Sequence, residues 1–179
     1  MAKDDLRRER IVEASKISSS HDANAIVGLL DSPESAVRLH AALAISRQEI
    51  TQALPELRRH VGSEEDADVR GAMAVTLAKL AVPESRDTLH GLLADQDENV
   101  RRMGLRGLSQ LGDESVIAEA AQWYDGGGWK MKQEAVDALS TLQTEASRTE
   151  LGRLKAHETS WWWRRQIRRA LNRRATANS

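Results

Sequence analysis

Near its end, the sequence concentrates the residue types that bind anions and stack on flat rings. The stretch from Trp161 to Arg174 reads WWWRRQIRRALNRR, with three tryptophans, six arginines and no acidic residue. Arginine binds phosphates and carboxylates through its planar fork of donors, and tryptophan packs on bases or apolar side chains. This stretch therefore suits a nucleic acid or an acidic partner, unless it is the last copy of a regular pattern.

Residues that could perform catalysis are scattered. The chain has no cysteine, which excludes disulfides and thiolate metal sites. The histidines follow no common spacing: His21, His40, His60, His90 and His157. The glycines at 126–128 lack the lysine and serine of a phosphate-binding loop and follow a predicted helix rather than a strand. The sequence predicts no catalytic site, metal or cofactor.

The composition favours an all-helical protein. The net charge is −1, yet the first 160 residues hold 20 Lys and Arg against 27 Asp and Glu. There is no Phe, so Leu, Ala, Val and Ile must build most of the core. No apolar run approaches the roughly 20 residues of a membrane span, and the charged start MAKDDLRRER argues against a secretory signal. We therefore expect a cytoplasmic protein without a membrane segment.

A unit of about 31 residues recurs five times along the chain. An apolar residue followed by a base opens each copy: Val37-Arg38, Val69-Arg70, Val100-Arg101, Met131-Lys132 and Trp163-Arg164. With the apolar residue as position 0, positions +4 and +7 are mostly small and +8 is Leu or Ile, which is one stripe of a helix. A second apolar segment ending near an acid precedes most copies. Each unit is therefore predicted to be helix A, a short turn and helix B.

This pattern resembles HEAT repeats, specifically the short phycobilisome-lyase-like subclass, over residues 22–175. The resemblance implies an all-α fold, a right-handed α-solenoid of about five helical hairpins plus an N-terminal capping helix, in one domain. The expected bounds are about 4–19 for the capping helix, 22–48, 49–81, 83–112, 113–143 and 144–175 for the repeats, and 176–179 for a polar tail.

The recurring bases form a ladder: Arg38, Arg70, Arg101, Lys132 and Arg164. Each is expected in the first turn of its helix, near acids such as Asp31, Asp68, Asp95 and Glu158. In the family that the pattern resembles, such bases bond across repeats to acids and carbonyls of the turns. We therefore interpret the ladder as structural.

The repeat explains part of the C-terminal stretch. Trp163 occupies position 0 and is expected in the core, whereas Arg168 and Arg174 replace apolar residues at +5 and +11, as a C-terminal cap requires. Trp129 and Trp161 are expected in turns between helices, where they either stack on each other or meet a partner. The secondary binding surface is predicted to comprise Trp129, Trp161, Trp162, Arg165, Arg169 and Arg173.

In such a solenoid, the B helices line the concave face. Positions +3, +6 and +10, with +2 at the edge, give the first repeats an apolar surface with a basic edge, unusual for exposed helix positions. The predicted partner-binding residues are Leu39, His40, Leu43, Arg47, Val75, Lys79, Arg102, Met103 and Arg106. We expect a non-catalytic scaffold that binds a protein or peptide with apolar anchors and acidic flanks. Alternatively, the N-terminal helix covers Leu39 and Leu43.

A second hypothesis is a nucleic-acid-associated module that uses the basic, Trp-bearing C-terminal repeat. It includes an enzyme of the HEAT-like DNA-glycosylase type, for which Asp137 is the only obvious candidate acid. The acidic first 160 residues would repel a phosphate backbone. The lyases of the resembled subclass attach tetrapyrroles, but no residue pattern here marks a pigment site. The oligomeric state stays open.

Overall fold

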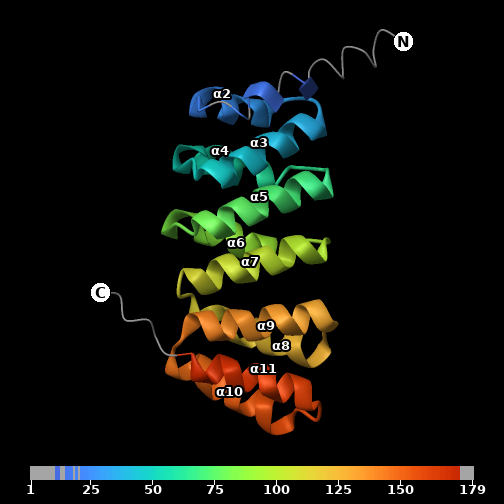
Figure 1. Ribbon diagram of the computed structural model, residues 1–179, viewed down its shortest axis with the longest axis vertical. Helices are drawn as coiled ribbons and strands as arrows, with labels where there is room; N and C mark the ends of the chain where they lie inside the picture. The colour runs from blue at the N-terminus through green and yellow to red at the C-terminus, as the bar shows by residue number, and fades with distance from the viewer. Residues whose placement is uncertain (1–10, 13–14, 18, 20, 174–179) are drawn as a thin grey trace. The chain divides into compact units, whose positions relative to one another are not determined.

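The computed structural model describes residues 11–12, 15–17, 19 and 21–173 (Figure 1). Most of the expected capping helix, together with Arg174 and the tail, lies outside the described residues, although 11–12, 15–17 and 19 are helical. The described residues form helices and turns without a strand, as expected for an all-α solenoid. The chain divides into two compact units, residues 1–104 and 105–179.

The first unit is built from hairpins whose A helix begins or ends in a 3-10 turn. The elements, in chain order, are α2 (Ala23–Gly28), η1 (Leu29–Asp31), α3 (Ser35–Gln48), η2 (Thr51–Ala53), α4 (Leu54–Val61), α5 (Ala67–Leu80), η3 (Pro83–Ser85), α6 (Arg86–Leu92) and α7 (Glu98–Gln110), which continues past residue 104. The B helices α3 and α5 pack side by side, and the A helices α2 and α4 pack against their own B helices (Figure 1).

The second unit repeats this plan. Its elements are η4 (Glu114–Val116), α8 (Ile117–Gly126), α9 (Trp129–Leu142), α10 (Glu145–His157) and α11 (Trp161–Asn172). The B helices α9 and α11 pack together, and so do the A helices α8 and α10.

The apolar stripe of each B helix forms the core. Position 0 is buried in every repeat, as are the residues at +4, and position +8 is buried in the first four: Ile45, Leu77, Leu108 and Leu139. Small residues let the helices approach closely, because a Cβ added at Gly104 would lie 2.8 Å from the Leu89 carbonyl oxygen. The predicted helical pattern is confirmed at these positions.

The helix ends follow from local chemistry. The Asp66 carboxylate accepts hydrogen bonds from the backbone N–H groups of Asp68 and Val69, which satisfies donors at the start of α5. Position +12 adopts a left-handed backbone after four B helices: Glu49, Ala81, Gly112 and Gln143. This conformation ends each helix and turns the chain towards the next A helix.

The start of the B helices differs from the sequence prediction. The residue two places before position 0 is the first helical residue each time, and so Trp129 and Trp161 begin α9 and α11 instead of lying in a turn. The prediction started each B helix near position 0, because the apolar stripe indicates a helix only from its first buried residue onwards.

Candidate partner-binding surfaces

The ladder bases of the first unit lie between repeats. The Arg38 guanidinium donates hydrogen bonds of 2.7 Å to both carboxylate oxygens of Glu64 and bonds to the carbonyls of Ser32 and Pro33. Burial opposes the charge of Glu64, but the Arg38 guanidinium and the Asp66 N–H outweigh it and hold the pKa of Glu64 below its ordinary value. The acid is therefore Glu64, which sequence analysis missed, instead of the nearby Asp31.

The same geometry recurs one repeat later. Arg70 donates to both carboxylate oxygens of Asp95, at 2.7 and 3.2 Å, and to the Glu64 carbonyl. Arg101 bonds to the carbonyls of Asp95 and Gln96. Glu64 and Asp95 each stand five residues before position 0 of their repeat. In the next repeat this place is Gly126, so the sequence offers Arg101 no carboxylate there.

In the second unit, the ladder includes a tyrosine. The Tyr124 hydroxyl donates a hydrogen bond to Glu158, and the Lys132 ammonium lies 3.8 Å from the same carboxylate and 4.8 Å from the centre of the Tyr124 ring. Burial, and then the bond to Glu158, raise the pKa of Tyr124. Burial would raise the pKa of Glu158 too, but the bonds from Tyr124 and from the Ser160 N–H lower it. Glu158 again stands five residues before position 0.

The B helices α3 and α5 expose apolar side chains. Leu43 is 49% exposed and Val75 is 42% exposed, both at position +6, while Leu39 is half-buried. Met103, expected on the same surface, is only 5% exposed and belongs to the core. We call Leu39, His40, Leu43, Arg47, Val75 and Lys79 the B-helix surface.

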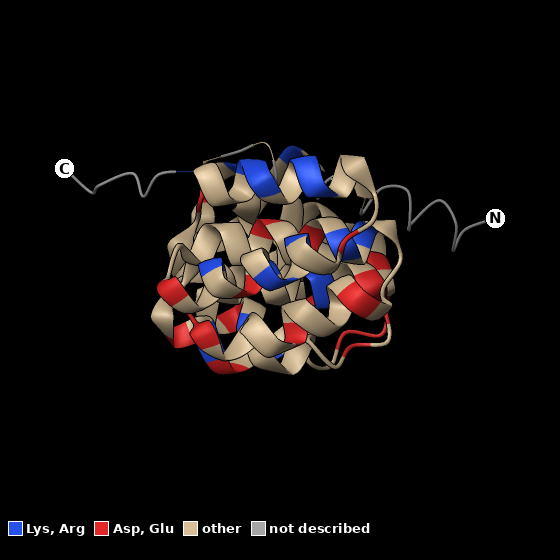
Figure 2. Cartoon of the chain, turned by 90° about the horizontal axis from the view of Figure 1, so that it is seen from below, with Lys and Arg blue, Asp and Glu red and all other residues tan. Residues whose placement is uncertain are grey.

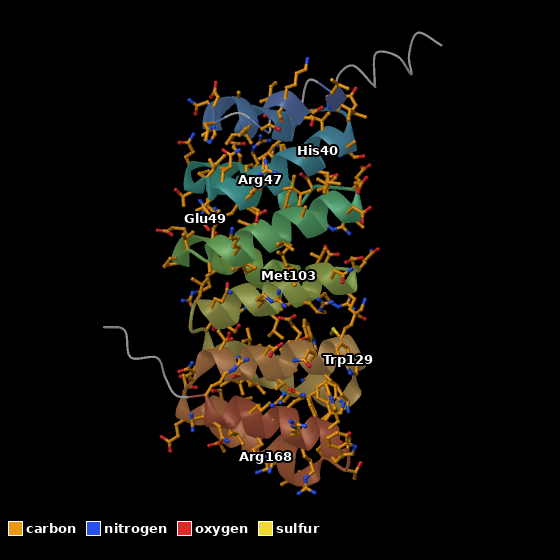
Figure 3. All side chains as sticks on the ribbon, viewed as in Figure 1. His40, Arg47, Glu49, Met103, Trp129 and Arg168 are labelled. Carbon is orange, nitrogen blue, oxygen red and sulfur yellow. The ribbon has the colours of Figure 1, made fainter. Side chains whose placement is uncertain are left out.

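The polar edge of this surface is partly held in place. The Lys79 ammonium donates to the Ser46 carbonyl at 2.7 Å and lies 3.2 Å from the Glu49 carboxylate. His40 is exposed, and its Nδ1 lies 2.7 Å from the Ala36 carbonyl oxygen, so this nitrogen is the donor. Figure 3 shows His40 and Arg47 along α3, with Glu49 beyond its end.

Arg102 and Arg106, both predicted to bind a partner, form bonds to side chains of the chain itself. Arg102 is half-buried and donates to the Asn99 side chain at 3.1 Å within its own helix. Arg106 is exposed, but its guanidinium bonds to both oxygens of Glu134 at 2.9 and 2.6 Å. Glu134 is 4% exposed, although its position +3 was expected to face solvent.

The tryptophans form a cluster in the second unit. The Trp129 ring centre lies 6.0 Å from that of Trp162 and 6.1 Å from that of Trp163, and Trp162 packs edge-on against Trp163 at 4.7 Å. Trp163 is in the core, as expected, whereas Trp129 remains 61% exposed. Trp161 is 71% exposed and contacts none of these rings, so Trp129 and Trp161 do not stack on each other.

Helix α11 carries a dense positive charge. Arg164, Arg165, Arg168 and Arg169 are exposed, and none of them has an acidic partner among the described residues. Arg173 donates to the Ser140 hydroxyl at 3.4 Å. Helix α11 contains no acidic residue. In Figure 2, where Lys and Arg are blue and Asp and Glu are red, the helix nearest the top of the picture carries blue segments and no red one.

The described part of the chain shows no catalytic constellation. It contains no group of three or more His, Asp or Glu side chains that could hold a metal ion, and no helix long and apolar enough to cross a membrane. The Asp137 carboxylate, the candidate acid of a glycosylase-type site, accepts a hydrogen bond from Gln133 at 2.9 Å.

Comparison with known proteins identifies the repeat. The sequence pattern of HEAT repeats matches residues 23–95, 62–126 and 90–172. The fold is similar to that in the complex of CpcE and CpcF of phycocyanin lyase from Nostoc sp. PCC7120, with a TM-score of 0.63, 18% identity and coverage of 83% of this chain and 96% of that chain. An engineered protein gives a TM-score of 0.60 at 18% identity, covering 93% and 89%. No curated protein matches the chain significantly.

Proposed function

The chain belongs to the HEAT-repeat family, and from this premise we propose that it is a non-catalytic protein-interaction scaffold whose B-helix surface holds a helix or an extended peptide. Repeats of this kind bury a core between stacked hairpins and leave extended helix faces for partners. The observation that carries the proposal is the exposure of Leu43 and Val75 on two neighbouring B helices.

Leu43 and Val75 occupy the same repeat position on packed helices, so they form a pair of apolar contacts along one face. Burying the exposed part of each side chain would contribute about 1 kcal/mol. The sum of about 2 kcal/mol corresponds to a Kd of only about 30 mM. The two residues therefore act as anchors within a larger contact, as in most interfaces, where few residues dominate the affinity.

The charged edge defines the partner further. His40 and Arg47 stand three and four residues from Leu43 on α3, and Lys79 stands four residues from Val75 on α5, so they share helix faces with the apolar pair. A partner with apolar anchors and acidic flanks complements both features. The charge of Lys79 is already shared with Glu49, so the edge contributes selectivity and association rate more than affinity.

The test compares three proteins in quantitative affinity purification from the source organism, with mass spectrometry as readout. The variant Leu43→Asp, Val75→Asp should lose a defined set of captured proteins by at least about tenfold, because a charge in an apolar contact costs several kcal/mol. The matched control is Thr51→Asp, Gly62→Asp, which adds the same charge at exposed positions of the A-helix side, where the Gly62 Cβ would meet no atom within 4 Å.

Circular dichroism must first show that all three proteins are equally helical. A partner that the wild-type protein and the control capture, and the Leu43→Asp, Val75→Asp variant does not, is then produced and titrated by calorimetry at low and at moderate salt. Its affinity should change little with salt, because apolar contacts are not screened by ions. Capture that is identical for the wild-type protein and both variants would refute the B-helix surface.

A further inference from the structure

Several B-helix positions contact the following repeat. The second unit shows two of them directly. The residue at −2, Trp129, packs on Trp162 and Trp163 of the next B helix. The base at +6 of α7, Arg106, bonds to Glu134 at +3 of α9.

The ladder supplies the third contact. The base at +1 bonds to the acid that stands five residues before position 0 of the next repeat, in the pairs Arg38–Glu64 and Arg70–Asp95, and more loosely in Lys132–Glu158. Positions −2 and +1 therefore contact the next hairpin, and so does position +6 where it is a base, as in α7, whereas the apolar +6 residues Leu43 and Val75 are exposed.

In α11 the residues at these three positions have no equivalent partner among the described residues. Trp161 stands at −2, Arg164 at +1 and Arg169 at +6, and all three are exposed. Trp161 contacts no other aromatic ring, and neither arginine has an acidic partner within the described residues. With Arg168 at +5, they form what we call the α11 surface.

We propose that the α11 surface docks an acidic helical hairpin of another protein, which stacks on it as a further repeat. The hairpin places one carboxylate opposite Arg164, as Glu64 lies opposite Arg38, and a second opposite Arg169, as Glu134 lies opposite Arg106. Trp161 packs on the start of its second helix, as Trp129 packs on Trp162.

The residue at +5 requires the partner to be acidic. This position is buried in all four earlier B helices, where it is Ala42, Ala74, Leu105 or Val136. In α11 it is Arg168, and an apolar hairpin would desolvate that guanidinium without compensation. A hairpin rich in carboxylates satisfies the three arginines of the α11 surface, which no described acid neutralises.

A second copy of this chain fits poorly. Its first hairpin has Ser32 at the offset of Glu64 and His40 at the offset of Glu134. Arg164 and Arg169 would then face no carboxylate, so charge complementarity favours a different chain. The arginines would also attract a nucleic acid. A nucleic acid, however, does not require that Trp161, Arg164 and Arg169 stand at the repeat positions −2, +1 and +6, which suit a further helical hairpin.

The test uses synthetic hairpins of about thirty residues, stapled by a disulfide and shown to be helical by circular dichroism. One hairpin carries Glu at the two positions equivalent to Glu64 and Glu134, which are five residues before its position 0 and position +3. Its matched counterpart carries Gln at both positions. Binding to the 179-residue chain is followed by fluorescence anisotropy of the labelled hairpin in moderate salt. The Glu hairpin should bind at least about tenfold more tightly than the Gln hairpin.

Two variants with the same change in charge separate the α11 surface from general attraction. Arg164→Glu, Arg169→Glu should weaken binding of the Glu hairpin at least tenfold, whereas Lys130→Glu, Arg165→Glu should change it by less than about threefold. Trp161→Ala should weaken it about fivefold, since an exposed ring gains contact only in the complex. The variant Leu43→Asp, Val75→Asp should bind normally, which keeps this result independent of the B-helix surface.

Four outcomes would overturn the proposal: no binding of the Glu hairpin up to about 1 mM, equal binding of the Gln hairpin, equal losses in both charge variants, or tighter binding of the oligonucleotide dT15 through Arg164 and Arg169. The last outcome would assign the α11 surface to single-stranded nucleic acid, whose affinity falls steeply with salt.

Discussion

The Glu64 carboxylate lies beneath the Arg38 guanidinium, with two bonds of 2.7 Å that join the first hairpin to the second. Arg70 and Asp95 repeat this arrangement at the next junction. The guanidinium groups also satisfy carbonyls of the turns that precede their own helices. The ladder therefore ties the turn within a repeat to the repeat that follows.

Removing a ladder base should destabilise the fold. We expect Arg70→Ala to lower the free energy of unfolding by about 2 kcal/mol. It removes both guanidinium bonds from the largely buried Asp95 carboxylate, which keeps only the Asp97 N–H, and it leaves the Glu64 carbonyl without its donor. The control is Arg59→Ala, whose pair with Asp31 is exposed and should contribute far less. Urea unfolding measures both; equal losses would contradict the structural role of the ladder.

Stability should fall in acid. The pKa values of Glu64, Asp95 and Glu158 are lowered in the folded chain, so the unfolded chain binds protons at higher pH. The stabilisation is complete at neutral pH and is lost as the pH falls from about 5 through the lowered folded pKa values. Urea unfolding between pH 7 and 3 should show this decrease.

Glu64→Gln removes one of these titrating groups. The variant should be less stable at pH 7 and should lose less stability on acidification than the wild-type chain. The same slope in both proteins would show that Glu64 does not contribute to the pH dependence.

A glycine turn sets the start of α9. A Cβ on Gly127 would lie 2.3 Å from the Trp123 carbonyl oxygen and 2.6 Å from the Met131 Cβ, and so Gly127→Ala should cost about 1–3 kcal/mol. Gly126→Ala, which meets no atom within 4 Å, should be neutral or slightly stabilising. Thermal unfolding followed by tryptophan emission compares the two; a tolerant Gly127 would mean that the turn rearranges freely.

The end of α9 offers a stabilising change. Gln143 has a φ of 54°, a left-handed conformation that a residue with a Cβ adopts at a cost. Gln143→Gly should therefore raise the free energy of unfolding by about 0.5–1 kcal/mol. Thr149→Gly, at an exposed position inside α10, should lower it by a similar amount. If both substitutions lowered the free energy of unfolding in urea, the cost of the left-handed backbone at Gln143 would be contradicted.

The repeated spacing was sufficient to predict the helical hairpins. Val69, Val100 and Met131 are all buried at the same place in their helices, because an apolar stripe of helical period has only one face to bury. The HEAT-repeat family could be recognised from the same five copies. The 3-10 turns were not predicted, since Pro83 and Glu114 fit the first turn of either helix type.

The surface residues were harder to predict. Met103 and Glu134 both stand at +3, where solvent exposure was expected, yet they are buried. Glu134 accepts both bonds of Arg106 from the preceding B helix, a pairing 28 residues apart that helical periodicity does not reveal. Glu64 was missed because its partner Arg38 is 26 residues away in the sequence. An acid at a constant offset of five residues before position 0 was the signal that could have revealed it.

The uneven distribution of aromatic residues provides a built-in spectroscopic label. Every tryptophan and the single tyrosine lie in residues 105–179, so near-ultraviolet emission monitors the melting of that part alone, whereas far-ultraviolet ellipticity monitors all helices. Superimposable melting curves from the two signals would reveal one cooperative transition, and displaced curves would give each unit its own melting temperature without any added dye.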